Sequence, residues 1–239
     1  MIPIAANPFI TSYAQSDGFG KAIFWALFLT SAICWIVIFY KGWELWAARK
    51  LSLHFSNDFT AQKADPLNLQ CTRPSWSKAI EAPHPLFEIY RAAKQQTLEI
   101  IDRNHVLQPD ASALLSPFDI EMIESQVALA IASMQKRLEK HLFILSTIAT
   151  LAPFLGLLGT VWGIFLALTH MQSTHLANNT AMLAGLSTAL ATTVIGLLIA
   201  IPALLGHNVL KNANRNARKD MEEFSHALLC SIELQYRKR

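Results

Sequence analysis

Hydrophobic and polar positions divide the chain into long apolar runs and more polar stretches with a helical period. Three runs, 22–40, 142–169 and 176–206, contain no Asp, Glu, Lys or Arg. A helix needs about 20 residues to cross a hydrocarbon core of about 30 Å, and these runs have that length or more. The pattern therefore predicts an all-α, polytopic membrane protein with three transmembrane helices.

A helical pattern also precedes the second run and follows the third. Ser116, Pro117 and Asp119 form a helix-start signature, in which the serine caps, the proline suits the first position and the aspartate follows three residues after the cap. Apolar residues then recur at three- and four-residue spacing without a helix breaker. We expect one uninterrupted helix into the second span, and two transmembrane helices extended into the cytoplasm. The stripes are Ile120, Ile123, Val127, Ile131, Met134, Leu138 and Leu142, and later Met221, Phe224, Leu228 and Ile232.

The stretch 58–85 contains four prolines among polar residues and predicts irregular chain, after which a helix is expected over 86–106. The prolines are Pro66, Pro74, Pro83 and Pro85.

Basic residues set the expected orientation, because short segments rich in Lys and Arg stay in the cytoplasm. Segment 41–141 holds 12 of the 20 basic residues, segment 207–239 holds 7, and Lys21 stands alone. We therefore expect the N-terminus in the periplasm and the C-terminus in the cytoplasm. The expected segments are a periplasmic N-terminus 1–20, transmembrane helix 21–41, cytoplasmic helical region 42–141, transmembrane helix 142–170, periplasmic loop 171–180, transmembrane helix 181–206 and cytoplasmic C-terminal helix 207–239.

The composition agrees with a membrane protein and argues against a soluble domain and a nucleic-acid-binding protein. Hydrophobic residues make up 52% of the chain and charged residues 15%, too apolar for an ordinary soluble domain. The net charge of +3 reflects the cytoplasmic bias, so no nucleic acid is expected as a partner. Cys34, Cys71 and Cys230 are widely separated, which indicates ordinary thiols with no metal site or disulfide framework.

Small residues in the second and third runs predict close helix packing. In lipid, helices associate by close approach, which glycine permits. This pattern favours an oligomer over a lone three-helix unit, with membrane lipid around it. The expected packing positions are Gly156, Gly159, Gly163, Gly185 and Gly196.

Pro153 and Pro202 each remove a backbone donor inside an apolar run. Each is interpreted either as a tolerated bend or as a bend that opens a wet cavity.

Hydroxyl side chains are concentrated in the same two runs, at Thr160, Ser187, Thr188, Thr192 and Thr193. A threonine in a membrane helix usually bonds to its own helix's carbonyls, but five together are also compatible with a polar interior that carries an ion. Hydroxyls do not titrate near neutral pH, so a proton path requires a titrating group from a partner.

His170 and His175 lie close together, but their spacing is a weak metal signal, and we expect solvated histidines and no metal. The chain has no H-E-x-x-H or G-x-S-x-G motif and no intramembrane carboxylate pair. An intramembrane enzyme is therefore the least supported interpretation, and we expect no catalytic residue and no cofactor.

The residues just described resemble the TolQ/ExbB family, which is more distantly related to the MotA flagellar stator subunit. The resemblance runs through LAPFLGLLGTVWGIFLAL (151–168) and LAGLSTALATTVIGLLIAIPALLGHNVL (183–210). PLFEIYRAA and MEEFSHALL look more like TolQ than ExbB.

This resemblance implies a homopentameric channel in the bacterial cytoplasmic membrane that encloses single-span TolR/ExbD-type subunits. A membrane aspartate of that partner would take up and release protons, and the motion would energise a TolA/TonB-like periplasm-spanning protein. By the family pattern Thr160 and Thr193 match pore-facing threonines, and Pro153 and Pro202 match helix-bending prolines. The ion, proton or sodium, stays open.

One position departs from the family pattern: relatives usually carry a glutamate where this chain has Thr188. Two interpretations stay open: either the partner's carboxylate suffices for proton transfer, or this chain conducts ions by a different route. The alternative function is a passive oligomeric scaffold without conduction, which would tolerate valine at Thr160 and Thr193.

Overall fold

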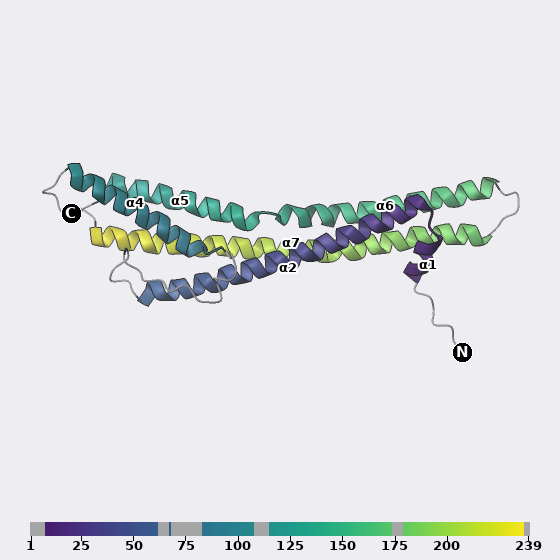
Figure 1. Ribbon diagram of the computed structural model, residues 1–239, viewed down its shortest axis with the longest axis horizontal. Helices are drawn as coiled ribbons and strands as arrows, with labels where there is room; N and C mark the ends of the chain where they lie inside the picture. Colours follow the sequence, from purple (N-terminus) through teal and green to yellow (C-terminus); the bar gives the residue numbers. More distant parts are fainter. Residues whose placement is uncertain (1–7, 62–66, 68–82, 108–114, 174–178, 237–239) are drawn as a thin grey trace. The chain divides into compact units, whose positions relative to one another are not determined.

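The computed structural model describes residues 8–61, 67, 83–107, 115–173 and 179–236, and these residues are almost entirely helical (Figure 1). The all-α fold expected from the sequence is confirmed. Its helices are α1 (Pro8–Gln15), α2 (Gly18–Ala61), α4 (Pro85–Leu107), α5 (Pro117–Glu139), α6 (Leu142–Ser173) and α7 (Asn179–Tyr236).

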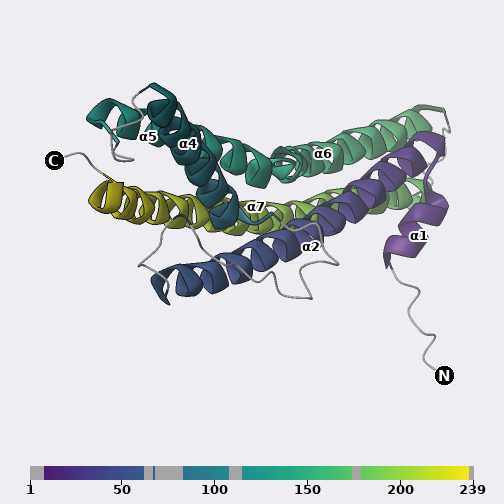
Figure 2. The same ribbon diagram turned by 60° about the vertical axis from the view of Figure 1, so that its left-hand side comes forward.

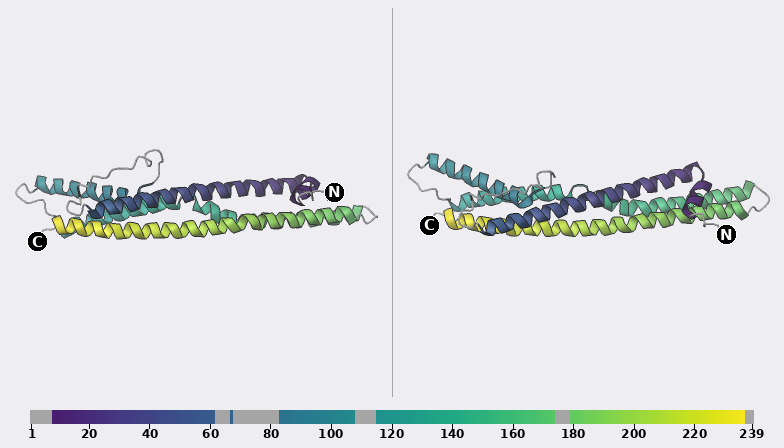
Figure 3. Two further views of the ribbon diagram at one scale, coloured as in Figure 1. Left: turned by 90° about the horizontal axis from the view of Figure 1, so that it is seen from below. Right: turned by 60° about the horizontal axis from the view of Figure 1, so that its bottom comes forward.

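Three stretches of the described chain are long and apolar enough to cross a membrane, as the sequence predicts. They lie in Gly18–Thr60, Pro117–Thr169 and Gly185–Tyr236. Helix α7 can be followed without interruption in Figure 3, from its green beginning to its yellow end. Helix ends do not mark the surfaces of a bilayer, so the membrane boundaries given above stay predictions.

The chain forms two compact units, each described here by itself. One consists of Met1–Tyr40 and His141–Val209, and the other of Lys41–Lys140 and Leu210–Arg239. Asp17 and Lys21 are the only Asp, Glu, Lys or Arg in the sequence of the first unit. We call the first the apolar unit and the second the charged unit.

The prediction of one uninterrupted helix from the apolar stripe that begins at Ile120 into the second span is wrong, because α5 ends at Glu139 and α6 begins at Leu142 (Figure 2). His141 has φ 73°, in the left-handed region that interrupts a helix. Neither Lys140 nor His141 is a sequence breaker, which explains why the pattern missed this interruption.

Side chains of the charged unit supply partners for the end of α5. The Leu138 carbonyl accepts hydrogen bonds from Lys41 Nζ at 3.3 Å and from Asn214 Nδ2 at 3.2 Å. Lys41 is buried, and its ammonium also donates to Glu44 Oε2 at 2.6 Å. The last carbonyls of a helix lack partners within it, so these donors stabilise an end at this place.

Helix α2 also differs from expectation, because it continues to Ala61 and so includes the first residues of the stretch expected to be irregular. Most of that stretch, with Pro66 and Pro74, lies outside the described residues. The next helix is close to its predicted position, since α4 covers Pro85–Leu107.

The predicted helix start at Ser116 is confirmed as a capping box. The Ser116 hydroxyl oxygen accepts a hydrogen bond from Asp119 N at 3.2 Å, and Ser116 N donates to Asp119 Oδ2 at 2.9 Å. Burial raises the pKa of Asp119, but hydrogen bonds from Ser116 and Asn104 and the Arg103 charge outweigh it and leave the pKa below its usual value.

The core of the charged unit is built from the apolar stripes that the spacing predicts. On α5 Ile123, Val127 and Leu138 are buried, and the whole α7 stripe is buried. Phe224 of that stripe packs edge-on against Phe55 and Phe59 of α2, with ring centroids 5.6 and 5.1 Å apart. Burial of large apolar side chains therefore holds this unit together.

Candidate functional site

Two glycines bring α6 and α7 of the apolar unit into backbone contact. A Cβ at Gly196 would lie 2.6 Å from the Ala152 carbonyl oxygen, and a Cβ at Gly156 would lie 3.0 Å from the Thr192 carbonyl oxygen. Such distances leave no room for a side chain, so these glycines permit the close approach of the two helices.

The seam continues along both helices toward Ser173 and Asn179. A Cβ at Gly159 would collide with the Thr192 side chain, and one at Gly163 would lie 2.9 Å from Ala189 Cβ. A Cβ at Gly185 would lie 3.2 Å from the Gly163 carbonyl oxygen. All five glycines singled out in the sequence thus lie on one α6–α7 contact, which we call the glycine seam.

Two threonines add polar contacts across the seam. Thr193 Oγ1 donates to the Gly156 carbonyl at 3.1 Å, and the buried Thr192 Oγ1 lies 3.5 Å from the same oxygen. Thr192 Oγ1 also donates to its own helix's Ala189 carbonyl at 2.8 Å. The two hydroxyls therefore converge on one carbonyl of α6.

The remaining singled-out hydroxyls do not donate to the Gly156 carbonyl. Thr160 Oγ1 donates to the Leu157 carbonyl of its own helix at 2.7 Å, and Ser187 is exposed. Thr188 is buried and donates to the Ser12 carbonyl of α1 at 3.3 Å. Within one chain the four candidate ion-path threonines therefore do not share a single cavity.

Both candidate prolines lie inside helices that continue on either side. Pro153 is within α6 and Pro202 within α7, and each is partly exposed. Each lacks the N–H that would bond to the carbonyl four residues earlier, at Ala149 and Leu198, so the backbone ladder of both helices is weakened there.

A small cavity of about 50 Å³ lies beside the glycine seam in the apolar unit. Thr188 and Thr192 of α7 line it together with Trp162 of α6, and Ser16 and Asp17 reach it from the residues before α2. The Trp162 indole Nε1 lies 3.2 Å from Asp17 Oδ1 and 3.1 Å from Asp17 Oδ2. We call this space the Asp17 cavity.

Asp17 and Trp162 are site residues that the sequence interpretation missed. A usable signal was present, because Asp17 is the single carboxylate in the sequence of the apolar unit. Asp17 lies in the N-terminal segment before the first apolar run, where the spacing of apolar residues does not distinguish it.

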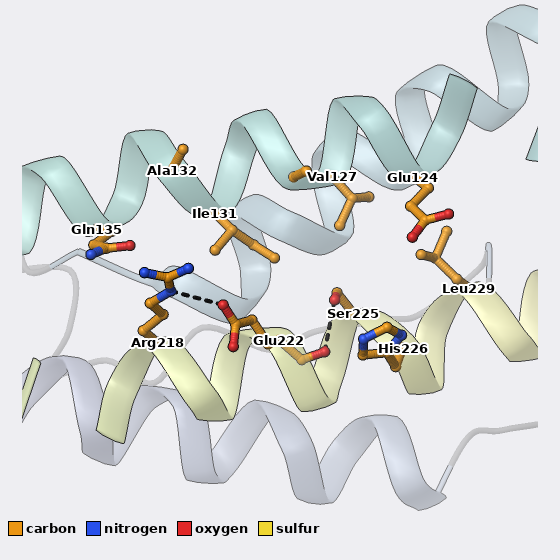
Figure 4. A pocket seen from close by; sticks show the side chains of 11 residues that line it. Glu124, Val127, Ile131, Ala132, Gln135, Arg218, Glu222, Ser225, His226 and Leu229 are labelled. Atoms are coloured by element: carbon orange, nitrogen blue, oxygen red, sulfur yellow. Dashed lines mark hydrogen bonds and ion pairs between the residues drawn. The ribbon is translucent and has the colours of Figure 1, made fainter. Parts of the chain in front are cut away.

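A larger groove of about 320 Å³ lies in the charged unit between α5 and α7 (Figure 4). Apolar Val127 and Ile131 face polar residues of α7, where Arg218 Nε donates to Glu222 Oε1 at 2.8 Å. Ser225 Oγ donates to the Glu222 main-chain carbonyl. The polar groups shown thus pair largely along α7 itself.

No group of three metal-ligating side chains occurs among the residues that the structure describes. His175 lies outside those residues, as does Cys71. Cys34, which is buried, and Cys230, which is exposed, are both free thiols.

Comparison with known proteins gives relatives that carry two names. The chain is 28% identical to the "Biopolymer transport protein ExbB" of Neisseria gonorrhoeae over 207 residues, 86% of this chain and 88% of that protein. It is 29% identical to the "Tol-Pal system protein TolQ" of Pseudomonas aeruginosa over 184 residues, 76% of this chain and 74% of that protein. An ExbB of Aquifex aeolicus is 38% identical over 91 residues, 38% of this chain and 62% of that protein.

These identities do not separate the two names, so the preference for TolQ stays a prediction. The sequence model of the MotA/TolQ/ExbB proton channel family matches residues 99–223, about half of the chain. This match includes α5, α6 and most of α7. The glycine seam and its threonines lie inside that match. The chain therefore belongs to the MotA/TolQ/ExbB proton channel family.

Proposed function

We propose that this protein is the channel-forming subunit of an inner-membrane motor complex driven by the proton-motive force. The observation that carries the proposal is the convergence of the Thr192 and Thr193 hydroxyls on the Gly156 carbonyl, within apolar runs of α6 and α7 that contain no Asp, Glu, Lys or Arg. Hydroxyls there can solvate a passing ion, and family membership supports conduction. The chain acts without enzymatic chemistry.

The titrating group of the motor comes from a partner in this proposal. The apolar runs 142–169 and 176–206 contain no Asp, Glu or His, the residues that proton relays in membranes use. A TolR/ExbD-like single-span protein with a membrane aspartate supplies it. The cycle energises a TolA/TonB-like periplasm-spanning protein, which suits relatives named for biopolymer transport and for the Tol-Pal system.

We further propose a homopentamer with its N-terminus in the periplasm and its C-terminus in the cytoplasm. Many large apolar side chains of the apolar unit are exposed in the single chain, and lipid and neighbouring copies would cover them. Examples are Phe28, Ile36, Phe39, Phe154, Val161, Leu190 and Val209.

A passive scaffold is the second candidate, and one observation favours it. Thr160 donates to its own helix, and Thr193 donates to a carbonyl of the neighbouring helix, so both hydroxyls have structural partners. A scaffold needs only this packing and no conduction.

Valine and serine substitutions separate the two candidates. Thr160→Val and Thr193→Val keep the side-chain shape and remove the hydroxyl, whereas the matched Thr→Ser variants keep the hydroxyl. We expect valine to abolish proton flux in vesicles that contain the purified complex, and serine to preserve it, with the oligomer intact by native mass spectrometry. Unchanged flux in the double valine variant would favour the scaffold.

A further inference from the structure

Asp17 is held at the junction between α1 and α2 by contacts from two elements. Its Oδ1 accepts a hydrogen bond from Gly20 N at 2.9 Å, at the start of α2. Both carboxylate oxygens also lie within 3.2 Å of the Trp162 indole nitrogen of α6. Asp17 is exposed, and these donors hold its carboxylate beside Trp162 of α6.

The cavity beside Asp17 is polar on several sides. Hydroxyls of Ser16, Thr188 and Thr192 line it, and all three side chains are buried. A water needs two to four polar partners and at least about 10–15 Å³ of accessible space. At about 50 Å³ the cavity satisfies both conditions beside a carboxylate.

Charge sets Asp17 apart from the other lining groups. The lining residues of α6 and α7 are Gly159, Trp162, Gly163, Leu166, Gly185, Thr188 and Thr192, and none of them has an acidic, basic or imidazole side chain. Lys21, one turn further along α2, is the nearest charged residue in the sequence and the only basic Lys or Arg of the apolar unit. Asp17 is thus the one acidic or basic side chain among the residues that line the cavity.

We propose that Asp17 is a proton-exchange site of the channel, placed at the cavity between the start of α2 and the glycine seam. A hydronium ion in the cavity gives its proton to an Asp17 carboxylate oxygen, leaving water and a neutral carboxyl group. The reverse transfer regenerates the carboxylate and the hydronium ion. This proposal rests on the proposed proton-channel function and adds a titrating group from this chain to the partner's aspartate.

Proton flux tests the site in the complex extracted gently from its own membrane and placed in phospholipid vesicles. Asp17→Asn keeps oxygen and shape but cannot titrate, so we expect flux to fall about a hundredfold or more. Asp17→Glu retains a carboxyl group and should keep measurable flux. Asp58→Asn, in the charged unit's part of α2, is the matched control and should leave flux unchanged.

Two outcomes separate this site from the proposed function. Unchanged flux in Asp17→Asn, together with loss of flux in Thr193→Val, overturns the Asp17 site and leaves the channel in place. A wild-type complex that conducts no protons overturns both.

Chemical labelling gives a second test that does not depend on a folded variant. A hydrophobic carbodiimide reacts with protonated carboxyl groups, and mass spectrometry of the digested wild-type complex locates the adduct. Labelling of Asp17 that decreases as pH rises supports the site. An unlabelled Asp17 in a complex whose partner carries labelled membrane aspartate overturns it.

Discussion

Helix α7 packs in two different ways along its length. In the apolar unit its contacts with α6 run through glycines and threonines, and a single methyl group at Gly196 would meet backbone oxygen. In the charged unit the same helix buries Met221, Phe224, Leu228 and Ile232. Lipid gives helices no hydrophobic reason to associate, so close fit dominates the first region, while burial of apolar area dominates the second.

The largest expected effect comes from filling the glycine seam. In Gly196→Leu the new side chain has no space beside the Ala152 carbonyl, so we expect the oligomer to be lost. Size-exclusion chromatography of detergent extracts measures this. Gly42→Ala is the control, because nothing lies within 4 Å of a Cβ at that position. A normal Gly196→Leu oligomer would contradict the packing assigned to the seam.

A substitution that leaves an empty space in the core of the charged unit should have a smaller effect, which lowers stability and does not prevent assembly. Leu228 is fully buried, and Leu228→Ala should lower the free energy of unfolding by about 2–5 kcal/mol. Thermal unfolding of the purified complex measures the loss. Leu234→Ala, at an exposed position of α7, is the control and should leave the midpoint nearly unchanged. An equal shift in both variants would argue against a buried core at Leu228.

Loss of the capping box should give a smaller effect that depends on pH. Asp119→Asn removes the carboxylate that accepts from Ser116, and should cost about 1 kcal/mol near neutral pH. Because the pKa of Asp119 is lowered in the fold, its contribution is complete above the ordinary carboxyl pKa of about 4. It disappears as pH falls through the lowered pKa. Unfolding midpoints from neutral to acid pH should therefore converge for wild type and variant.

The smallest expected effect is the loss of one seam hydroxyl. Thr192→Val removes donation to the Ala189 carbonyl of its own helix and the 3.5 Å interhelical contact with the Gly156 carbonyl, while keeping the shape that fills the space at Gly159. Interhelical hydrogen bonds in membranes contribute about 0.6 kcal/mol each, so the unfolding midpoint should change little. A loss as large as that of Leu228→Ala would show that hydrogen bonding, and not close fit, dominates the seam.

Sequence patterns predicted the parts of this fold that depend on periodicity. Four residues of the α5 stripe, Ile123, Val127, Met134 and Leu138, and the whole stripe from Met221 to Ile232 are buried as their spacing indicates, whereas Ile131 is half-buried at the groove. The interruption at His141 was not predictable, because its stabilising donors, Lys41 and Asn214, come from distant parts of the chain.

In the candidate site too, local spacing predicted one feature and could not predict another. Glycine spacing indicated the seam, whereas the Asp17 cavity combines residues from three separate elements, which no local pattern encodes. Thr188, the position where the family pattern has a glutamate, lines the same cavity as Asp17. The sequence alone gave no reason to connect these two positions.

The interruption at Lys140–His141 has a consequence for tolerance of insertions and deletions. An added residue within a continuous helix turns everything beyond it by about 100°, which would misalign either the seam or the stripe of α7. The same insertion beside His141 falls in non-helical chain, where α5 and α6 keep their own rotational phases. Length changes should therefore be accepted at 140–141 and rejected within α7 between the seam and the stripe.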